Sequence, residues 1–176
     1  MMAASSRVPE IDEPPSDAVW YFAYGSNLCR AIFIERRGMR PLAARCARLD
    51  GHRLCFDLPV GPGERGVANV ELDAADHVWG VAYLLCADDF ERLDRTEGVH
   101  RGLYAREAVT LTTDDGESIA GFTYRSAFST AGRKPSARYL GLLLEGARSH
   151  GLPAEYVARL EALELAVDER LTKTEA

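Results

Sequence analysis

The sequence contains few cysteines, and they lie far apart. The four are Cys29, Cys46, Cys55 and Cys86. No two of them form a Cys-x-x-Cys pair, and no two histidines lie at ligand spacing, so the usual pattern of a zinc site is missing. We therefore expect no bound metal.

Positive charge is also in short supply. The chain has 21 lysines and arginines against 27 aspartates and glutamates, which gives a net charge of −6. A nucleic-acid-binding surface needs a basic patch, and this balance argues against one. The densest positive group is ERRGMR at 35–40, and we interpret it as a solvated helix end, where arginines suit the helix dipole. We therefore expect no nucleic-acid partner.

Long hydrophobic runs are absent. No segment approaches the roughly 18 apolar residues that span a membrane. The first residues, MMAASSRVPEIDEPPSDA, contain no apolar stretch of signal-peptide length. The sequence therefore predicts no membrane partner, reduced cysteines and a cytoplasmic location.

Length and composition predict one domain behind a short leader. A chain of 176 residues is long enough to bury one core. Three prolines, three serines and several acids fall within the first 17 residues, a composition typical of disorder. We expect a disordered leader over 1–17 and a single domain over 18–170.

The remaining chain mixes strand and helix patterns. Aromatic and β-branched segments predict strands over 19–24, 45–49, 53–58, 67–72, 77–85, 105–113 and 117–124. The tripeptides DGH at 50–52 and DDG at 114–116 predict hairpin turns. Helices are expected over 28–37, 88–96 and 136–149 and again from Pro153. Since strict βαβ alternation is absent, we expect an α+β fold whose six or seven strands could close into a barrel.

The segment YGSNL stands where the first strand runs into the first helix. Gly25 permits a sharp turn and a close approach by a ligand, and Ser26 and Asn27 follow at the expected helix start. Exposed backbone N–H groups at such a turn suit a small carboxylate or a phosphate. A nucleotide is poorly supported, because there is neither a Gly-x-Gly-x-x-Gly pattern nor a P-loop lysine. The alternative is a capped turn without a ligand.

Glu97 is a candidate for acid–base chemistry. It lies four residues after Leu93, so a continued helix puts its carboxylate on the inward apolar stripe. An unpaired charge is costly there, and a carboxyl with a raised pKa would suit proton transfer. The alternatives are an exposed residue at a frayed helix end and an ion-pair partner for Arg95 or Arg101. Asp94 falls off the stripe and is interpreted as solvated.

Four segments in this order resemble the γ-glutamylcyclotransferases. They are YFAYGSNL at 21–28, VWGVAYLL at 78–85, LDRTEGV at 93–99 and GLPAEY at 151–156. The resemblance extends over residues 20–165, most of the chain, and is closer to the general branch of the family than to the glutathione-specific branch. It implies an α+β fold built on a small mixed or antiparallel β-barrel flanked by helices.

The resemblance also implies a reaction and its residues. A γ-glutamyl amino acid, or a related γ-glutamyl amide, cyclises to 5-oxoproline and releases the amine, without a cofactor. The glutamate of the EG segment corresponds to Glu97 and serves as general acid and base. The substrate-binding residues that it implies are Tyr21, Phe22, Ala23, Tyr24, Gly25, Ser26, Asn27, Tyr104 and Tyr139.

Four questions stay open in the sequence. The same site could belong to a binding module for 5-oxoproline or γ-glutamyl ligands that has lost catalysis, and Cys29 could be a nucleophile if a base lay beside it. The two apolar C-terminal helices could pack on the barrel or form a homodimer. The loops at 59–66 and 125–134 could border the part of the site that receives the leaving group. The sequence therefore does not define which γ-glutamyl amide is the physiological substrate.

Overall fold

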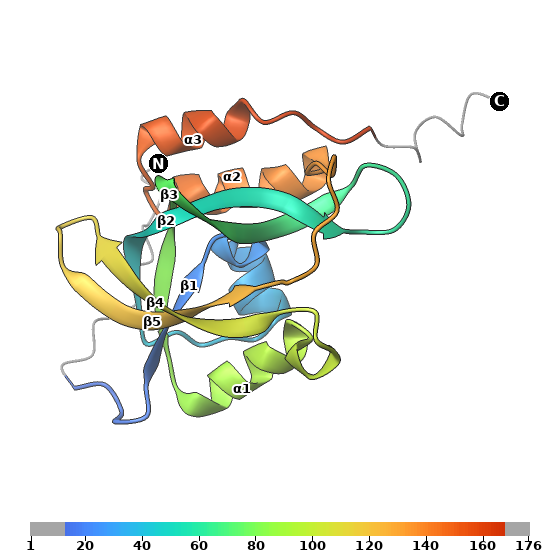
Figure 1. Cartoon of the computed structure of the whole chain (residues 1–176). Coiled ribbons are helices and arrows are strands. Elements are labelled where there is room, and N and C mark those ends of the chain that lie inside the picture. The colour runs from blue at the N-terminus through green and yellow to red at the C-terminus, as the bar shows by residue number, and fades with distance from the viewer. Residues whose placement is uncertain (1–12, 168–176) are drawn as a thin grey trace, which may run out of the picture.

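The described part of the chain is built on a closed β-barrel. The computed structural model describes residues 13–167. Within them, strands β1 (Val19–Ala23), β2 (Ala43–Pro59), β3 (Gly66–Leu85), β4 (Ala105–Thr113) and β5 (Ser118–Arg125) follow the order β1-β3-β2-β4-β5 around the barrel (Figure 1). All neighbours are antiparallel except β1 and β5, which pair in parallel where Tyr21 lies opposite Phe122. The predicted α+β fold with a mixed barrel is confirmed.

The prediction of a hairpin turn at DGH is wrong. Strand β2 continues through Gly51, which adopts a left-handed φ of +73°. The ladder passes from Asp50 opposite His77 to His52 opposite Leu72, so that residues 73–76 bulge out of β3. The chain reverses instead at the Gly- and Pro-rich segment 60–65. The strands predicted over 45–49 and 53–58 therefore form one strand, β2, and those predicted over 67–72 and 77–85 form β3. The turn at DDG forms as predicted.

The helices pack on the outside of the barrel. Helices α2 (Ala137–Ser149) and α3 (Ala154–Glu161) lie side by side next to β2 and β3, and α1 (Ala87–Thr96) lies on the opposite side (Figure 1). In place of the helix predicted over 28–37 there is a 3₁₀ turn, η1 (Ser26–Leu28), and a six-residue π-helix, η2 (Ala31–Arg36). A second 3₁₀ turn, η3 (Val99–Arg101), follows α1.

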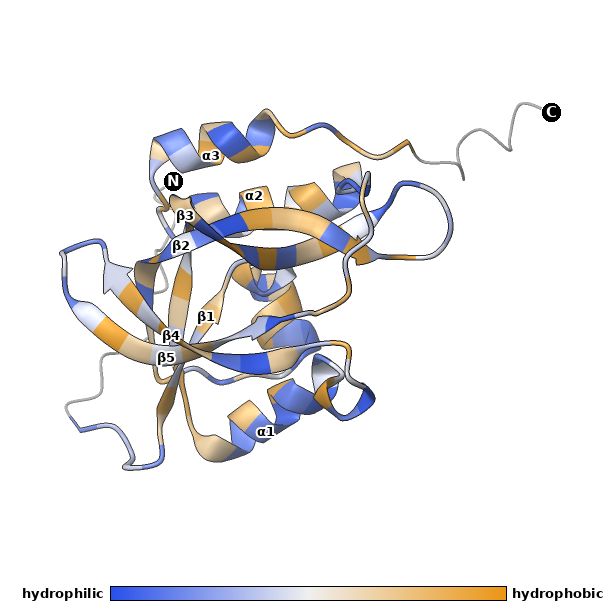
Figure 2. Ribbon diagram, in the orientation of Figure 1, coloured by the Kyte–Doolittle hydropathy of each residue, from blue (hydrophilic) through white to orange (hydrophobic). Residues whose placement is uncertain are grey.

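The core fills the barrel and the gap between the barrel and α2. Strand β1 is hydrophobic along most of its length (Figure 2), and Phe22 at its centre is fully buried. Leu28 and Leu143 are also fully buried, where η1 meets α2. The contact is close because Gly146 has no side chain: a Cβ there would lie 2.4 Å from the Leu28 carbonyl carbon and oxygen. Burial of η1 under α2 therefore fixes the turn that follows β1.

Some predictions concern the ends of the chain. Most of the predicted leader, and the predicted domain end at 168–170, lie outside the described residues. Residues 13–17 are exposed and belong to no helix or strand. Across 13–167 there is no helix with the length and apolar character needed to cross a membrane.

Replacing Gly146 by alanine should destabilise the fold. The added methyl group meets backbone atoms of Leu28 that cannot move without shifting η1. We expect the free energy of unfolding to fall by about 1–3 kcal/mol in chemical denaturation. Gly141 is the matched control, because it lies on the same helix with nothing within 4 Å of its Cβ position. Gly141→Ala should leave stability unchanged or raise it by up to about 1 kcal/mol, and equal losses in both variants would contradict the packing described here.

Candidate active site

The chain leaves β1 through a narrow turn at Gly25. A Cβ at Gly25 would lie 3.0 Å from the Tyr139 hydroxyl and 3.2 Å from the Ala68 Cβ. The residues that follow form only the three-residue turn η1, which is too short for a sizeable helix dipole. The full helix N-terminus that the sequence predicted after Gly25 is therefore replaced by a single short turn.

Glu97 ends α1 at the edge of this turn. Its N–H donates to the Leu93 carbonyl, and Gly98, with a left-handed φ of +69°, then redirects the chain. The side chain of Glu97 is 14% exposed. The structure thus places the carboxylate on the inward side of the helix end, as its spacing from Leu93 indicated.

Two donors hold one oxygen of that carboxylate. The Arg37 guanidinium donates to Glu97 Oε1 at 2.5 Å, and the Asn27 amide donates to the same atom at 3.0 Å. Neither predicted alternative partner, Arg95 or Arg101, forms this pair within the described residues. The interpretation of Arg37 as part of a solvated helix end is wrong, because η2 turns it towards α1, where four-fifths of its side chain is buried.

Asn27 also connects Glu97 to the barrel. The Asn27 amide nitrogen donates to the Tyr21 hydroxyl at 2.8 Å. Asn27 is 4% exposed. The oxygen of its side-chain amide, Oδ1, has no hydrogen-bond partner within the described residues. The asparagine of YGSNL therefore positions the carboxylate from the side of β1.

A ring of tyrosines completes a cavity of about 200 Å³ around Glu97. Burial raises the pKa of Tyr139 to about 12, and it holds the pKa values of Tyr21 and Tyr104 further above their usual range. The Tyr104 hydroxyl donates to the Ala68 carbonyl at 2.8 Å, and the Tyr139 hydroxyl accepts from the Ala68 N–H at 3.1 Å. These phenols stay neutral at physiological pH, and Tyr139 retains its proton for a ligand.

The structure brings most of the predicted site residues together. Those that line the cavity are Tyr21, Tyr24, Gly25, Ser26, Asn27, Glu97, Tyr104 and Tyr139. Phe22 and Ala23 do not reach it, because both are fully buried in the core. The sequence reasoning missed four other residues that line the cavity: Arg37, Val67, Ala68 and Tyr124.

Asp94 has a role that the sequence reasoning overlooked. It accepts hydrogen bonds from the Tyr124 hydroxyl at 2.6 Å and from the Arg106 guanidinium at 2.6 and 2.7 Å. The interpretation of Asp94 as a solvated residue is therefore wrong. Through Tyr124, Asp94 supports one wall of the cavity. In the sequence, only its position three residues before Glu97 pointed to this role.

Other candidate chemistry lies elsewhere. Cys29 is fully buried and does not line the cavity, which removes it as a candidate nucleophile. Ligand atoms of Cys55, Asp57 and Glu71 lie within 4.8 Å of one another on β2 and β3. Sequence spacing did not reveal this group, because two strands contribute to it. It could hold a metal ion, although Glu71 already pairs with Arg53.

Known proteins with similar sequences are named as cyclotransferases. The gamma-glutamylcyclotransferase of Homo sapiens is 34% identical over 170 residues, which cover 92% of this chain and 87% of the human protein. The gamma-glutamyl cyclotransferase gliK of Claviceps purpurea is 36% identical, over 74% of this chain and 63% of that protein. A model of the AIG2-like family matches residues 77–160.

Solved structures agree with this similarity. A structure named gamma-glutamyl cyclotransferase superposes with a TM-score of 0.73 at 30% identity, over 89% of this chain and 97% of that one. A yeast enzyme specific to glutathione superposes with a TM-score of 0.60 at 12% identity, which shows the fold alone. The mixed barrel with flanking helices is thus the γ-glutamylcyclotransferase-like fold. The chain belongs to the γ-glutamylcyclotransferase family, and the resemblance predicted from its motifs is confirmed.

Replacing Asn27 by leucine tests how the carboxylate is positioned. Leucine has a similar volume, but it cannot donate to Tyr21 or Glu97. The free energy of unfolding should fall by about 1–3 kcal/mol, and turnover of γ-glutamyl substrates should fall beyond what the unfolded fraction explains.

A second buried asparagine provides the matched control. Asn69 exchanges two hydrogen bonds with the backbone of Ser126 and does not line the cavity. Asn69→Leu should lose comparable stability in the same denaturation assay while the folded fraction keeps its turnover. An equal loss of turnover in Asn27→Leu and Asn69→Leu would contradict the positioning of the Glu97 carboxylate by Asn27.

Proposed function

We propose that the protein converts γ-glutamyl amino acids or related γ-glutamyl amides to 5-oxoproline and the free amine, with Glu97 as general acid and base. The observation that carries this proposal is the Glu97 carboxylate, held at one oxygen inside a cavity lined by neutral tyrosines. Family membership supports the reaction class. The position of the carboxylate beside the turn at Gly25 supports the assignment of the base.

Proton transfer is the first requirement of the reaction. The substrate's α-amine must attack its own γ-carbonyl carbon, and at neutral pH that amine is an ammonium ion. Arg37 and Asn27 both donate to Oε1 of Glu97, and we assign Oε2 as the atom that takes the proton. A carboxylate in hydrogen-bond reach of the amine can act as base and then return the proton as acid.

Bond formation and bond cleavage then follow at one carbon atom. The amine nitrogen bonds to the γ-carbon, and the carbonyl oxygen becomes an oxyanion in a tetrahedral intermediate. As the intermediate collapses, the bond to the leaving nitrogen breaks, and Glu97 donates a proton to this nitrogen. The ring nitrogen gives up its second proton to the released amine, which leaves as an ammonium ion. The sum is one amide bond broken and one formed with no change of oxidation state, so the proposal includes no cofactor.

The turn after β1 supplies groups for the rest of the substrate. Backbone N–H groups at Gly25, Ser26 and Asn27 can donate to the oxyanion or to the α-carboxylate, and so can the Tyr139 hydroxyl. Holding the γ-glutamyl chain folded in a small cavity favours ring closure, because the reacting atoms are already close together. Four free cysteines fit a reducing, cytoplasmic setting for this reaction.

Replacement of Glu97 by glutamine should abolish 5-oxoproline release. Glutamine keeps the size of the side chain but cannot take the proton from the ammonium group. We expect a fall in kcat of at least about 100-fold, the lower range for a lost general base, measured as 5-oxoproline released from a panel of γ-glutamyl dipeptides. Glu91→Gln, an exposed change on the same helix, should leave the rate unchanged.

A binding module would behave differently in the same assays. If the wild-type protein binds 5-oxoproline in calorimetry but releases none from any substrate of the panel, the site recognises the ligand without catalysis. An unchanged rate in Glu97→Gln would instead show that another group is the base.

A further inference from the structure

A second and larger cavity adjoins the one around Glu97. Its volume is about 590 Å³, and it shares four lining residues with the smaller cavity: Ser26, Arg37, Val67 and Tyr139. With the γ-glutamyl group beside Glu97, the group bonded to its γ-carbonyl has to extend out of the smaller cavity. The larger cavity adjoins the smaller one and can receive it.

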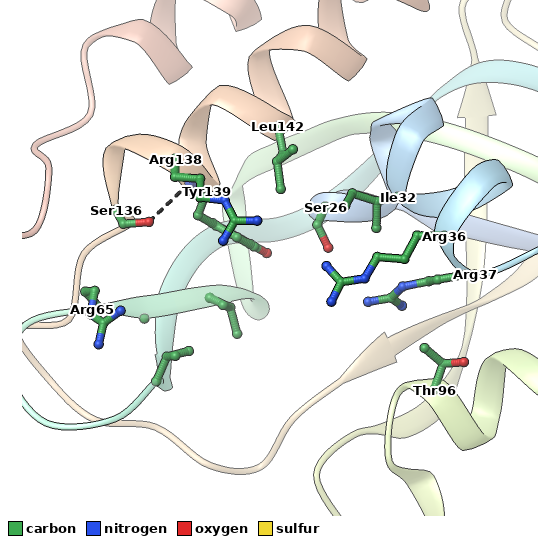
Figure 3. Close-up of a pocket in the computed structure, with 13 residues that line it drawn as sticks. Ser26, Ile32, Arg36, Arg37, Arg65, Thr96, Ser136, Arg138, Tyr139 and Leu142 are labelled. Atoms are coloured by element: carbon green, nitrogen blue, oxygen red, sulfur yellow. Dashed lines mark hydrogen bonds between the residues drawn. The ribbon is translucent and has the colours of Figure 1, made fainter.

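Four arginines from three separate segments line this larger cavity. Arg36 and Arg37 extend from η2 on one side, Arg138 from the first turn of α2 and Arg65 from the β2–β3 turn on the other (Figure 3). No aspartate or glutamate is among its lining residues. The N-terminal end of α2, whose N-cap is Ser136, adds further positive potential.

These arginines have few charge partners within the protein. Among residues 13–167, Arg36, Arg65 and Arg138 form no ion pair, and Arg37 pairs with Glu97. Like charges gathered around one space repel each other, and an anion in that space relieves the repulsion. The grouping stands out further because the whole chain has a net charge of −6.

We propose that the leaving group of the substrate is an amine that carries two carboxylates, as the acidic amino acids do. This inference rests on the proposed function and names its substrate class: γ-glutamyl conjugates of glutamate or aspartate. A neutral amino acid brings one carboxylate, which one planar guanidinium can bind at both oxygens. The remaining arginines of the cavity then have a second carboxylate to bind.

Calorimetry on the Glu97→Gln protein tests this without turnover. The probes are γ-glutamyl-glutamate and γ-glutamyl-glutamine, which have nearly the same shape and differ in one negative charge. We expect γ-glutamyl-glutamate to bind at least about tenfold more tightly at low salt, from one additional charge-assisted contact. The preference should shrink at high salt, because Arg36 and Arg138 are exposed to solvent.

Arginine variants in the same background identify the contacts. Arg138→Gln and Arg65→Gln should each reduce the preference for γ-glutamyl-glutamate by roughly severalfold while changing γ-glutamyl-glutamine binding less. Arg148→Gln is the control, because it removes the same charge from α2 at an exposed residue outside the cavity. Equal affinities for the two probes, no binding of either, or a preference that survives both cavity replacements would overturn the inference.

Turnover by the wild-type protein separates this inference from the proposed function. If γ-glutamyl-glutamate binds preferentially but no 5-oxoproline forms, the anion site stands and the cyclotransferase proposal fails. If γ-glutamyl-glutamine turns over as fast as γ-glutamyl-glutamate and binds equally well, the reaction stands and the acidic leaving group fails.

Discussion

The double hydrogen bond to one oxygen of Glu97 is the contact on which the arrangement of the site depends. A largely buried carboxylate is unfavourable unless donors compensate for the water that it has lost. Asn27 in η1 and Arg37 at the end of η2 supply that compensation, and they lie 70 and 60 residues away from Glu97 in sequence. Moving α1 or η2 would separate Glu97 from Arg37, and moving η1 would remove the hydrogen bond from Asn27. The positions of β1, η2 and α1 are therefore linked to one another through this carboxylate.

The two cavities divide the charges of a substrate between them. The smaller one presents one carboxylate and several neutral hydroxyl groups, which suits an ammonium group that must lose a proton. The larger one presents guanidinium groups and no acid, which suits anions. Arg37 lines both cavities and pairs with Glu97, so it stands at the boundary between them. Under the proposed function, the substrate's ammonium group faces Glu97 and the carboxylates of the leaving group face the arginines, so electrostatics favours this orientation.

Local patterns predicted those parts of the fold and site that local chemistry determines. The stop after β1, the position of Glu97 four residues beyond Leu93 and the DDG turn all follow from spacing and residue type. The merged strands β2 and β3 could not be predicted, because β2 continues through DGH only when β3 pairs with it on both sides of the 73–76 bulge. Arg37 gave no signal, since its direction depends on the π-helical turn of η2. The YFAYGSNL motif led to the inclusion of Phe22 and Ala23 among the site residues. Both belong instead to the hydrophobic core that β1 helps to form.

A crystal structure of the Glu97→Gln protein with γ-glutamyl-glutamate bound would test the site most directly. The substrate's α-amine should lie within hydrogen-bond distance of the Gln side chain at position 97, with the glutamate leaving group in the arginine-lined cavity near Arg138. A γ-glutamyl group bound with its amine away from position 97, or a ligand outside both cavities, would contradict the assignment of Glu97 as the base.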